Sequence, residues 1–317
     1  MNPELLKYAQ ENLDKMPPEV QQKVGELIAE ARKLTTRELA HTDFMAFVNY
    51  VWPNFIHGRH HQRMARAFER VARGECKRLI INMAPRHSKS EMASYLLPAW
   101  FLGKFPQKKI IQASYNAELA VGFGRKVRNL VDSEAFKNIF PEVELRSDSK
   151  AAGRWNTNHN GDYFAIGVGG NMTGRGADIM IIDDPHSEQE ATQAEFDPTI
   201  YDKTFEWYTS GPRQRLQPGG AIVVVMTRWS QRDLTGQVLK SSAQRGGEEW
   251  EVIEFPAIMP SGKPLWPEFW SLEELSALKE ELPNAKWQAQ YQQNPVGNES
   301  AIIKRDWWKW WEKDEPP

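Results

Sequence analysis

The chain has 317 residues, of which 40% are hydrophobic and 26% are charged, a composition typical of a soluble globular protein. No apolar run approaches the roughly 20 residues that a membrane helix requires, and residues 1–16 lack the core of a signal peptide, so we expect a cytosolic protein. The formal net charge of −2 excludes a strongly basic field, and any DNA contact would need local basic patches. The single cysteine, Cys76, excludes an internal disulfide.

The chain alternates between predicted helices and predicted strands. After Pro17 and Pro18, apolar residues at helical spacing over 20–31 predict an accessory helix that packs on the core, with an oligomer contact as the alternative. Further helices are predicted over 61–73, 89–101, 117–131 and 198–208, and strands over 78–83, 109–113, 163–168, 179–182, 221–226 and 251–255. A capping box at 271–274 opens a last short helix. This alternation predicts an α/β fold with a mostly parallel sheet covered on both faces.

Residues 83–90 (MAPRHSKS) form a polar loop between a predicted buried strand and a predicted helix. Loop amides and a helix N-terminus at such a place can hold the phosphates of a nucleotide. Lys89 could then reach the β- and γ-phosphates, and the Ser90 hydroxyl could bind Mg²⁺. The simple P-loop motif has glycines where Met83 and Ser88 stand, so a solvated basic turn is the alternative interpretation.

Two acids follow the apolar strand predicted over 179–182. Asp183 is the candidate Mg²⁺ ligand, and Asp184 is the candidate carboxylate that orients or deprotonates the attacking water. Glu188 and Glu190 compete with Asp184 for that role, and a strand end capped by solvated acids is the alternative. A Lys-Ser loop followed about 90 residues later by such a strand is the order that P-loop ATPases require.

A glycine-rich turn over 169–176 lies just before the acidic strand and contains Arg175 between two glycines. An arginine so placed could reach a γ-phosphate in its own subunit or in a neighbouring one. The alternative is a loop arginine in water.

Four segments in this order resemble the ATPase domain of tailed-bacteriophage large terminase subunits. They are the deviant nucleotide loop at 84–91 (APRHSKSE), the acidic strand with its approach at 171–176 and 181–185, the coupling segment at 224–229 and 233–236, and the end of the domain at 291–295 (YQQNP). The resemblance spans roughly residues 50–310.

The resemblance implies a RecA-like P-loop fold and assigns roles to individual residues. Lys89 and Ser90 would belong to the nucleotide loop, with Arg86 touching phosphate and His87 and Ser88 completing the loop. Gln62 would read adenine, and Arg175 matches the region of a proposed trans-acting arginine finger. Thr227 and Arg228 would sense the nucleotide state. ATP and Mg²⁺ are the implied substrate and metal.

The resemblance also implies a function and a domain organisation. ATP hydrolysis would drive double-stranded viral DNA into a procapsid in the host cytoplasm, with the portal protein and the small terminase subunit as partners. The chain would assemble as a ring, expected to be pentameric, with a monomer as the alternative for the isolated chain. Residues 1–45 are expected to be a helical extension, 46–296 the ATPase domain, and 297–317 a linker toward a nuclease domain that this chain lacks, so no nuclease activity is expected.

Two other functions compete with the packaging motor. One is a helicase-like DNA translocase, which would need a second RecA-like domain for which no room is visible. The other is a nucleotide-binding scaffold that does not hydrolyse ATP, against which Asp183 and Asp184 argue. DNA contacts would be made to phosphates, and the candidate side chains are those of Arg125, Lys126, Arg128, Arg213 and Arg215, each with a solvated face as the alternative.

Overall fold

The computed structural model describes residue 8 and residues 11–296, so the predicted linker over 297–317 lies outside the described residues. The strands are β1 (Arg78–Met83), β2 (Lys109–Ser114), β3 (Leu145–Ala151), β4 (Arg154–Thr157), β5 (Asp162–Gly167), β6 (Ala177–Asp183), β7 (Leu216–Met226) and β8 (Glu251–Phe255). The α-helices are α2 (Pro18–Thr42), α3 (Phe44–Val51), α4 (Arg59–Ala72), α5 (Leu97–Lys104), α6 (Ala117–Val131), α7 (Glu134–Ile139), α8 (Glu188–Ala194), α9 (Ile200–Ser210), α10 (Leu234–Arg245), α11 (Leu272–Glu281) and α12 (Asn284–Lys286). Short helical turns of other types are η1 (Leu13–Lys15), η2 (Glu91–Leu96), η3 (Pro212–Arg215) and η4 (Trp287–Tyr291).

The strands form one sheet in the order β3-β4-β5-β2-β6-β7-β1-β8. The strands from β5 to β8 in this order run parallel, and the hairpin of β3 and β4 adds an antiparallel edge. One strand, β7, therefore separates β1, which leads into the loop at 84–90, from β6, which ends at Asp183. The predicted α/β fold with a mostly parallel sheet is confirmed. Within the described part of the chain, no helix combines the length and the apolar character needed to cross a membrane.

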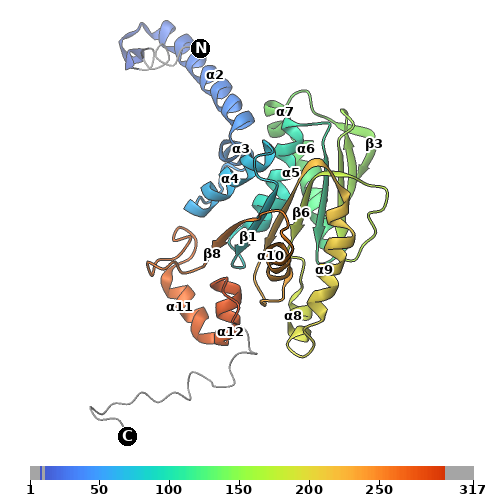
Figure 1. Ribbon diagram of the computed structural model, residues 1–317. Helices are drawn as coiled ribbons and strands as arrows, with labels where there is room; N and C mark the ends of the chain where they lie inside the picture. The colour runs from blue at the N-terminus through green and yellow to red at the C-terminus, as the bar shows by residue number, and fades with distance from the viewer. Residues whose placement is uncertain (1–7, 9–10, 297–317) are drawn as a thin grey trace, which may run out of the picture.

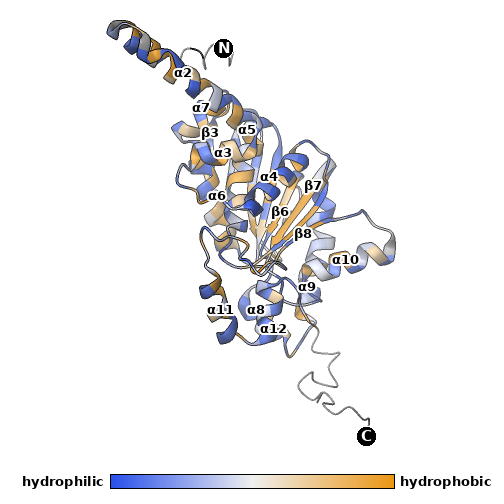
Figure 2. Cartoon of the chain, turned by 90° about the vertical axis from the view of Figure 1, so that its left-hand side faces the viewer, coloured by the Kyte–Doolittle hydropathy of each residue, from blue (hydrophilic) through white to orange (hydrophobic). Residues whose placement is uncertain are grey.

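Alternating side chains of the central strands enter two separate cores. Leu79 and Ile81 of β1 pack with helices α3 to α7, whereas Ile80 packs on the opposite face with side chains from α9 and α10. This alternation follows from the two-residue period of a strand, and it explains why these strands are apolar throughout rather than every second residue. Figure 2 shows the hydrophobic strands between the polar outer surfaces of the helices.

Helix α2 leaves the body of the molecule at its N-terminal half (Figure 1). Ala31 and Ala40 are buried, but Val20 and Leu27 are 43% and 57% exposed. The predicted packing of the whole apolar side on the core is therefore wrong for the first half of the helix, which contacts the short turn η1 instead. The predicted boundary at residue 45 falls inside α3, whose Phe44 and Phe47 are fully buried.

Candidate nucleotide site

The loop at 84–90 connects the end of β1 to η2 and takes a backbone path that side chains rarely allow. Arg86 and Ser88 have positive φ angles of 60° and 62°. Residues other than glycine seldom adopt this left-handed conformation. Ser88 thus reaches the backbone conformation for which a glycine is expected in the simple motif, whereas Met83 ends β1 as an ordinary strand residue.

Lys89 is buried and faces two carboxylates. Its Nζ lies 2.9 Å from Oδ2 of Asp184, and the residue is only 6% exposed. Burial opposes the positive charge, but the carboxylates of Asp184 and Asp183 outweigh burial and raise the pKa of Lys89. Lys89 therefore carries its charge at neutral pH in the place where phosphate would need it.

Asp183 ends β6 and accepts hydrogen bonds from two hydroxyl groups. Ser90 Oγ donates to Oδ1 at 2.9 Å, and Ser94 Oγ donates to Oδ2 at 2.7 Å. Burial, followed by repulsion from Asp184, raises the pKa of Asp183 to about 7, against the opposing effects of Lys89 and of the two serines. A hydroxyl and a carboxylate in contact are ligands that suit Mg²⁺, which keeps waters and substrate phosphates as its other ligands. Among the described residues no cluster of three or more histidine, cysteine or acidic side chains could hold a metal without such help.

Asp184 is fixed by the backbone of β7. It has a positive φ of 41°, its amide donates to Val225 O at 2.9 Å, and its Oδ1 accepts from the Thr227 amide at 2.9 Å. Its side chain is 28% exposed, so it faces both Lys89 and solvent. This position suits a carboxylate that must contact water while it stays beside Lys89.

The two competing acids are placed differently. Glu190 caps α8 by accepting the Ser187 amide at 2.9 Å, and Glu188 is exposed in the first turn of the same helix. Of these three acids, the structure brings only Asp184 into contact with Lys89.

Thr227 joins the loop to the acidic strand. Its Oγ1 donates to Met83 O at 3.1 Å, while its amide holds Asp184. A residue that contacts both sides of the site is well placed to respond to a nucleotide, because β7 lies between β1 and β6.

Solved structures of phage large terminases have a similar fold. The large terminase of bacteriophage HK97 superposes with a TM-score of 0.51 at 14% identity, covering 76% of this chain and 51% of that protein. A mutant ATPase domain of a Thermus phage large terminase superposes with a TM-score of 0.50 at 15% identity, covering 79% of this chain and 98% of that domain. The chain has the RecA-like fold of a large terminase ATPase domain. It spans about half the length of the HK97 large terminase. No protein-family model and no curated protein matches the sequence.

Within this terminase fold, Arg175 lies far from the nucleotide loop. Its guanidinium is 3.2 Å from Asp162 Oδ2 and 3.9 Å from the centre of the Phe164 ring, at the amino-terminal edge of the sheet. Lys89 and Asp183 lie at the carboxyl edge. Since a strand rises about 3.3 Å per residue, the length of β6 alone separates the two edges by roughly 20 Å. The structure thus does not support a contact of Arg175 with a γ-phosphate in its own subunit. A contact with a γ-phosphate in a neighbouring subunit stays a prediction.

Arg228 is held by two carboxylates. It is buried in an ion pair with Asp233 at 2.9 Å and lies 3.7 Å from Glu254. Asp233 also caps α10 by accepting the Gly236 amide. Arg228 therefore fixes the turn after β7, and its response to the nucleotide stays a prediction.

Of the remaining residues predicted to contact the nucleotide, some are buried and some are exposed. Arg86 is exposed, while His87 is buried with its Nδ1 2.8 Å from Pro85 O, and burial lowers the pKa of His87. Gln62 is exposed on α4, and its adenine contact stays a prediction. The neighbouring His60 and His61 are buried at 2% and 0% exposure, so they belong to the interior and not to the surface.

Two contacts of the site were not predicted. Ser94 holds Asp183, and the signal for it was a hydroxyl four residues after Ser90, which places both on one side of the helical segment. His61 contacts Ser88 at 2.5 Å, and nothing local in the sequence indicates this pair, because 27 residues separate the two.

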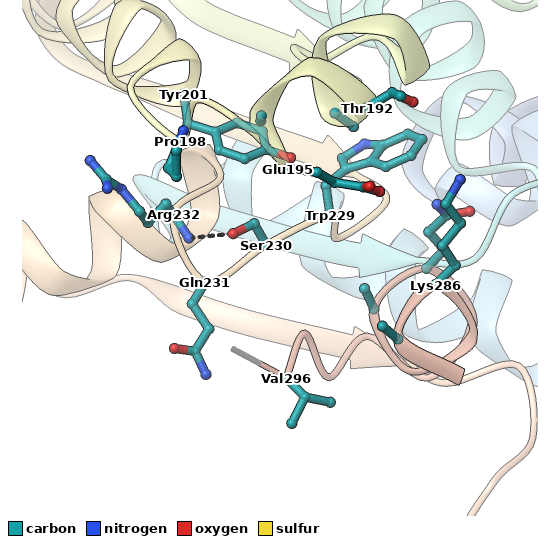
Figure 3. A pocket seen from close by; sticks show the side chains of 15 residues that line it. Thr192, Glu195, Pro198, Tyr201, Trp229, Ser230, Gln231, Arg232, Lys286 and Val296 are labelled. Atoms are coloured by element: carbon teal, nitrogen blue, oxygen red, sulfur yellow. Dashed lines mark hydrogen bonds between the residues drawn. The ribbon is translucent and has the colours of Figure 1, made fainter. Parts of the chain in front are cut away.

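A cavity of about 460 Å³ lies apart from the nucleotide loop, between α8, α9, the turn after β7 and the segment of α12 and η4. Figure 3 shows Tyr201 and Trp229 in its wall with Glu195, Arg232 and Lys286 around them. The Arg232 amide donates to Ser230 Oγ at 3.1 Å in this wall. None of the predicted nucleotide residues lines this cavity.

The candidate DNA-contacting residues occupy two surfaces. Arg125 and Lys126 are exposed on α6, and Arg128 beside them donates to Lys150 O at 2.8 Å. Arg213 is paired with Glu248 at 3.0 Å, which reduces its availability for phosphate.

Proposed function

We propose that this chain hydrolyses ATP and that hydrolysis drives double-stranded DNA into a viral procapsid. The observation that carries the proposal is the meeting of Lys89, Ser90, Asp183 and Asp184 at the carboxyl edge of a terminase-type sheet. In open α/β sheets, ligands bind at this edge. A portal protein, a small terminase subunit and a pentameric ring are the partners that the proposal includes.

The proposed reaction transfers the γ-phosphoryl group to water. The water oxygen bonds to phosphorus while the bond from phosphorus to the β–γ bridging oxygen breaks, and Asp184 accepts the hydrogen bond that orients the water. Lys89 exchanges Asp184 for the phosphates, and this exchange frees the Asp184 carboxylate to contact water. Mg²⁺ held by Ser90 and Asp183 would neutralise charge on the phosphate oxygens.

A scaffold that binds nucleotide without hydrolysing it would not need a water-facing carboxylate beside the lysine. Asp184 is held in such a position by the Thr227 amide, at the expense of a left-handed backbone. Backbone strain of this kind is commonly found at functional sites. This observation favours hydrolysis over a scaffold.

Steady-state ATP hydrolysis with Mg²⁺ tests the proposal. We expect Lys89→Ala, Asp183→Ala and Asp184→Ala each to lower the rate by about 10²-fold or more, because each removes a charge aligned with the reacting phosphate. Lys240→Ala, an exposed lysine on α10, is the matched control and should keep the wild-type rate. A folded wild-type protein that binds ATP without turnover at any concentration would favour the scaffold. If ATP is hydrolysed, DNA uptake into procapsids that carry the portal tests the packaging part of the proposal.

A further inference from the structure

A chain of hydrogen bonds connects the start of α4 to the nucleotide loop. The Gly58 amide donates to Nδ1 of His61 at 2.9 Å, Nε2 of His61 lies 2.5 Å from Ser88 Oγ, and Ser88 Oγ donates to His87 O at 2.7 Å. An amide can only donate, so Nδ1 must be the acceptor and Nε2 must carry the proton. The chain therefore runs in one direction and requires one neutral tautomer of His61.

This chain passes through Ser88, whose backbone is left-handed. Ser88 has a φ of 62°, and it directly precedes Lys89. A residue with a Cβ tends to leave this left-handed conformation unless a contact holds it. The bond from His61 holds the Ser88 side chain, and the bond to His87 fixes its hydroxyl proton. Relaxation of the Ser88 backbone would break both bonds.

The surroundings keep His61 neutral. It is fully buried, with the Phe55 and Trp266 rings centred 4.7 Å and 4.9 Å away. Burial lowers the pKa of His61 to about 2, assisted by the neighbouring His60, His57 and His87. Protonation of Nδ1 would place its N–H against the Gly58 amide, which is also a donor. The acceptor at Nδ1, and with it the donor at Nε2, is thus maintained through the physiological pH range.

We propose that His61 is a positioning residue that holds Ser88 in the left-handed conformation and so directs Lys89 toward phosphate. This inference rests on the proposed ATP hydrolysis. It explains how the loop works without the glycine that the simple motif places at position 88: a tertiary hydrogen bond replaces the conformational freedom of glycine.

Nucleotide kinetics test the proposal through coupling between the two residues. His61→Leu removes the donor and Ser88→Ala removes the acceptor, and we expect each to raise KM for ATP by about tenfold with less than about a threefold change in kcat, since tenfold corresponds to one lost hydrogen bond. The KM for ATP of the double variant should be no higher than that of either single variant. His61→Gln, which keeps a side-chain N–H, should recover most of the loss.

Two further backgrounds separate positioning from packing. In a Ser88→Gly background the loop no longer needs the bond, so adding His61→Leu should change KM by less than about twofold. Phe55→Leu damages the same packing without touching the hydrogen bond, and it should lower Tm without raising KM. Additive losses in the double variant, or a rise in KM for Phe55→Leu equal to that for His61→Leu, would overturn the proposal.

A measurement without ATP keeps this inference separate from the proposed function. Two-bond ¹H–¹⁵N spectra of the histidine rings should show His61 as the Nε2–H tautomer from pH 5 to pH 8, and Ser88→Ala should shift that signal. An Nδ1–H tautomer or a charged ring would refute the proposed role of His61 even in an active ATPase. The expected tautomer in a protein without ATP turnover would refute only the proposed function.

Discussion

Two adjacent carboxylates and one lysine lie together at the site, and their charges do not balance. Lys89 is paired with Asp184, which leaves Asp183 without a full counter-charge. Ser90 and Ser94 donate hydrogen bonds to Asp183 but bring no charge. The carboxylate of Asp183 is therefore held in a place where its negative charge is unfavourable until a cation compensates it.

The pH dependence of folding should reveal this unfavourable charge. The pKa of Asp183 rises from an ordinary 3.8 to about 7 on folding, so between these values the folded protein binds the proton more tightly than the unfolded chain does. The stabilisation is present below pH 4 and is lost as pH rises through about 7. Without Mg²⁺, the unfolding free energy of the wild type should fall relative to Asp183→Asn by roughly 1–3 kcal/mol over this range, because one pKa unit corresponds to about 1.4 kcal/mol.

Urea unfolding at pH 5, 6, 7 and 8 measures the difference. Asp132→Asn is the contrasting control, because the hydrogen bond from Lys137 lowers the pKa of Asp132, and its contribution is lost as pH falls. Parallel curves for the wild type and Asp183→Asn would show that the charge of Asp183 is compensated by the protein itself.

Ser94 should matter for the metal and not for the nucleotide base. Its Oγ lies 2.7 Å from Asp183 Oδ2 in a fully buried position, so it fixes the orientation of the carboxylate. Groups that orient a metal ligand commonly contribute tenfold or more to affinity or activity, and we expect Ser94→Ala to raise the Mg²⁺ concentration for half-maximal ATP hydrolysis about tenfold. The ATP KM at saturating Mg²⁺ is the internal control and should stay within about twofold. Equal Mg²⁺ curves for both proteins would show that Ser90 alone orients Asp183.

The sequence predicts those site residues that stand at strand ends. Lys89, Ser90, Asp183 and Asp184 follow buried strands, and parallel strands bring their carboxyl ends together. His61 could not be found in the same way, because its partner is set by how α4 lies on the sheet.

At the level of elements, buried strands and amphipathic helices were predictable and polar edges were not. The helix expected over 117–131 has those bounds in α6, and the strands expected over 78–83 and 251–255 are β1 and β8. The hairpin of β3 and β4 was missed, because most residues of β3 are exposed and show no alternation of apolar side chains. Such a strand is specified by its neighbour β4 and not by its own pattern.

Two glycines of α6 test how closely this helix packs on the sheet. A Cβ at Gly124 would lie 2.6 Å from Ala152 O and 3.0 Å from Tyr163 Cε1, whereas a Cβ at Gly122 meets nothing within 4 Å. Gly124→Ala should lower the unfolding free energy by about 1–3 kcal/mol, because the helix must move off β5. Gly122→Ala should raise it by about 0.5–1 kcal/mol through helix propensity. Thermal and urea unfolding compare the two variants, and equal effects would mean that α6 packs more loosely than the structure shows.

Over the whole molecule, the nucleotide loop and Arg175 occupy opposite edges of one sheet. Within a single subunit the arginine rests on Phe164 and Asp162, about the length of a strand away from Lys89. In a ring, each subunit contacts its neighbour through two different surfaces, so the edge that carries Arg175 can face the edge that carries the loop of the next subunit. An arginine finger on this fold would therefore work only between subunits.

Mixing two inactive variants tests this arrangement. Lys89→Ala subunits keep Arg175 but lack the lysine of the loop, and Arg175→Ala subunits have the reverse defect. We expect Arg175→Ala alone to lower the rate of ATP hydrolysis by about 10³-fold. If the arginine acts between subunits, an equal mixture at concentrations that allow assembly should recover roughly a quarter of the wild-type rate, because about one interface in four joins an intact loop to an intact arginine. The control mixes Arg175→Ala with the Lys89→Ala, Arg175→Ala double variant, which offers no intact arginine and should stay inactive.

Recovery that requires assembly would assign Arg175 to the neighbouring site, since an arginine acting in its own subunit cannot repair a different chain. A mixture that assembles and stays inactive would remove Arg175 from the catalytic site and leave its contacts with Phe164 and Asp162 as its role in the fold.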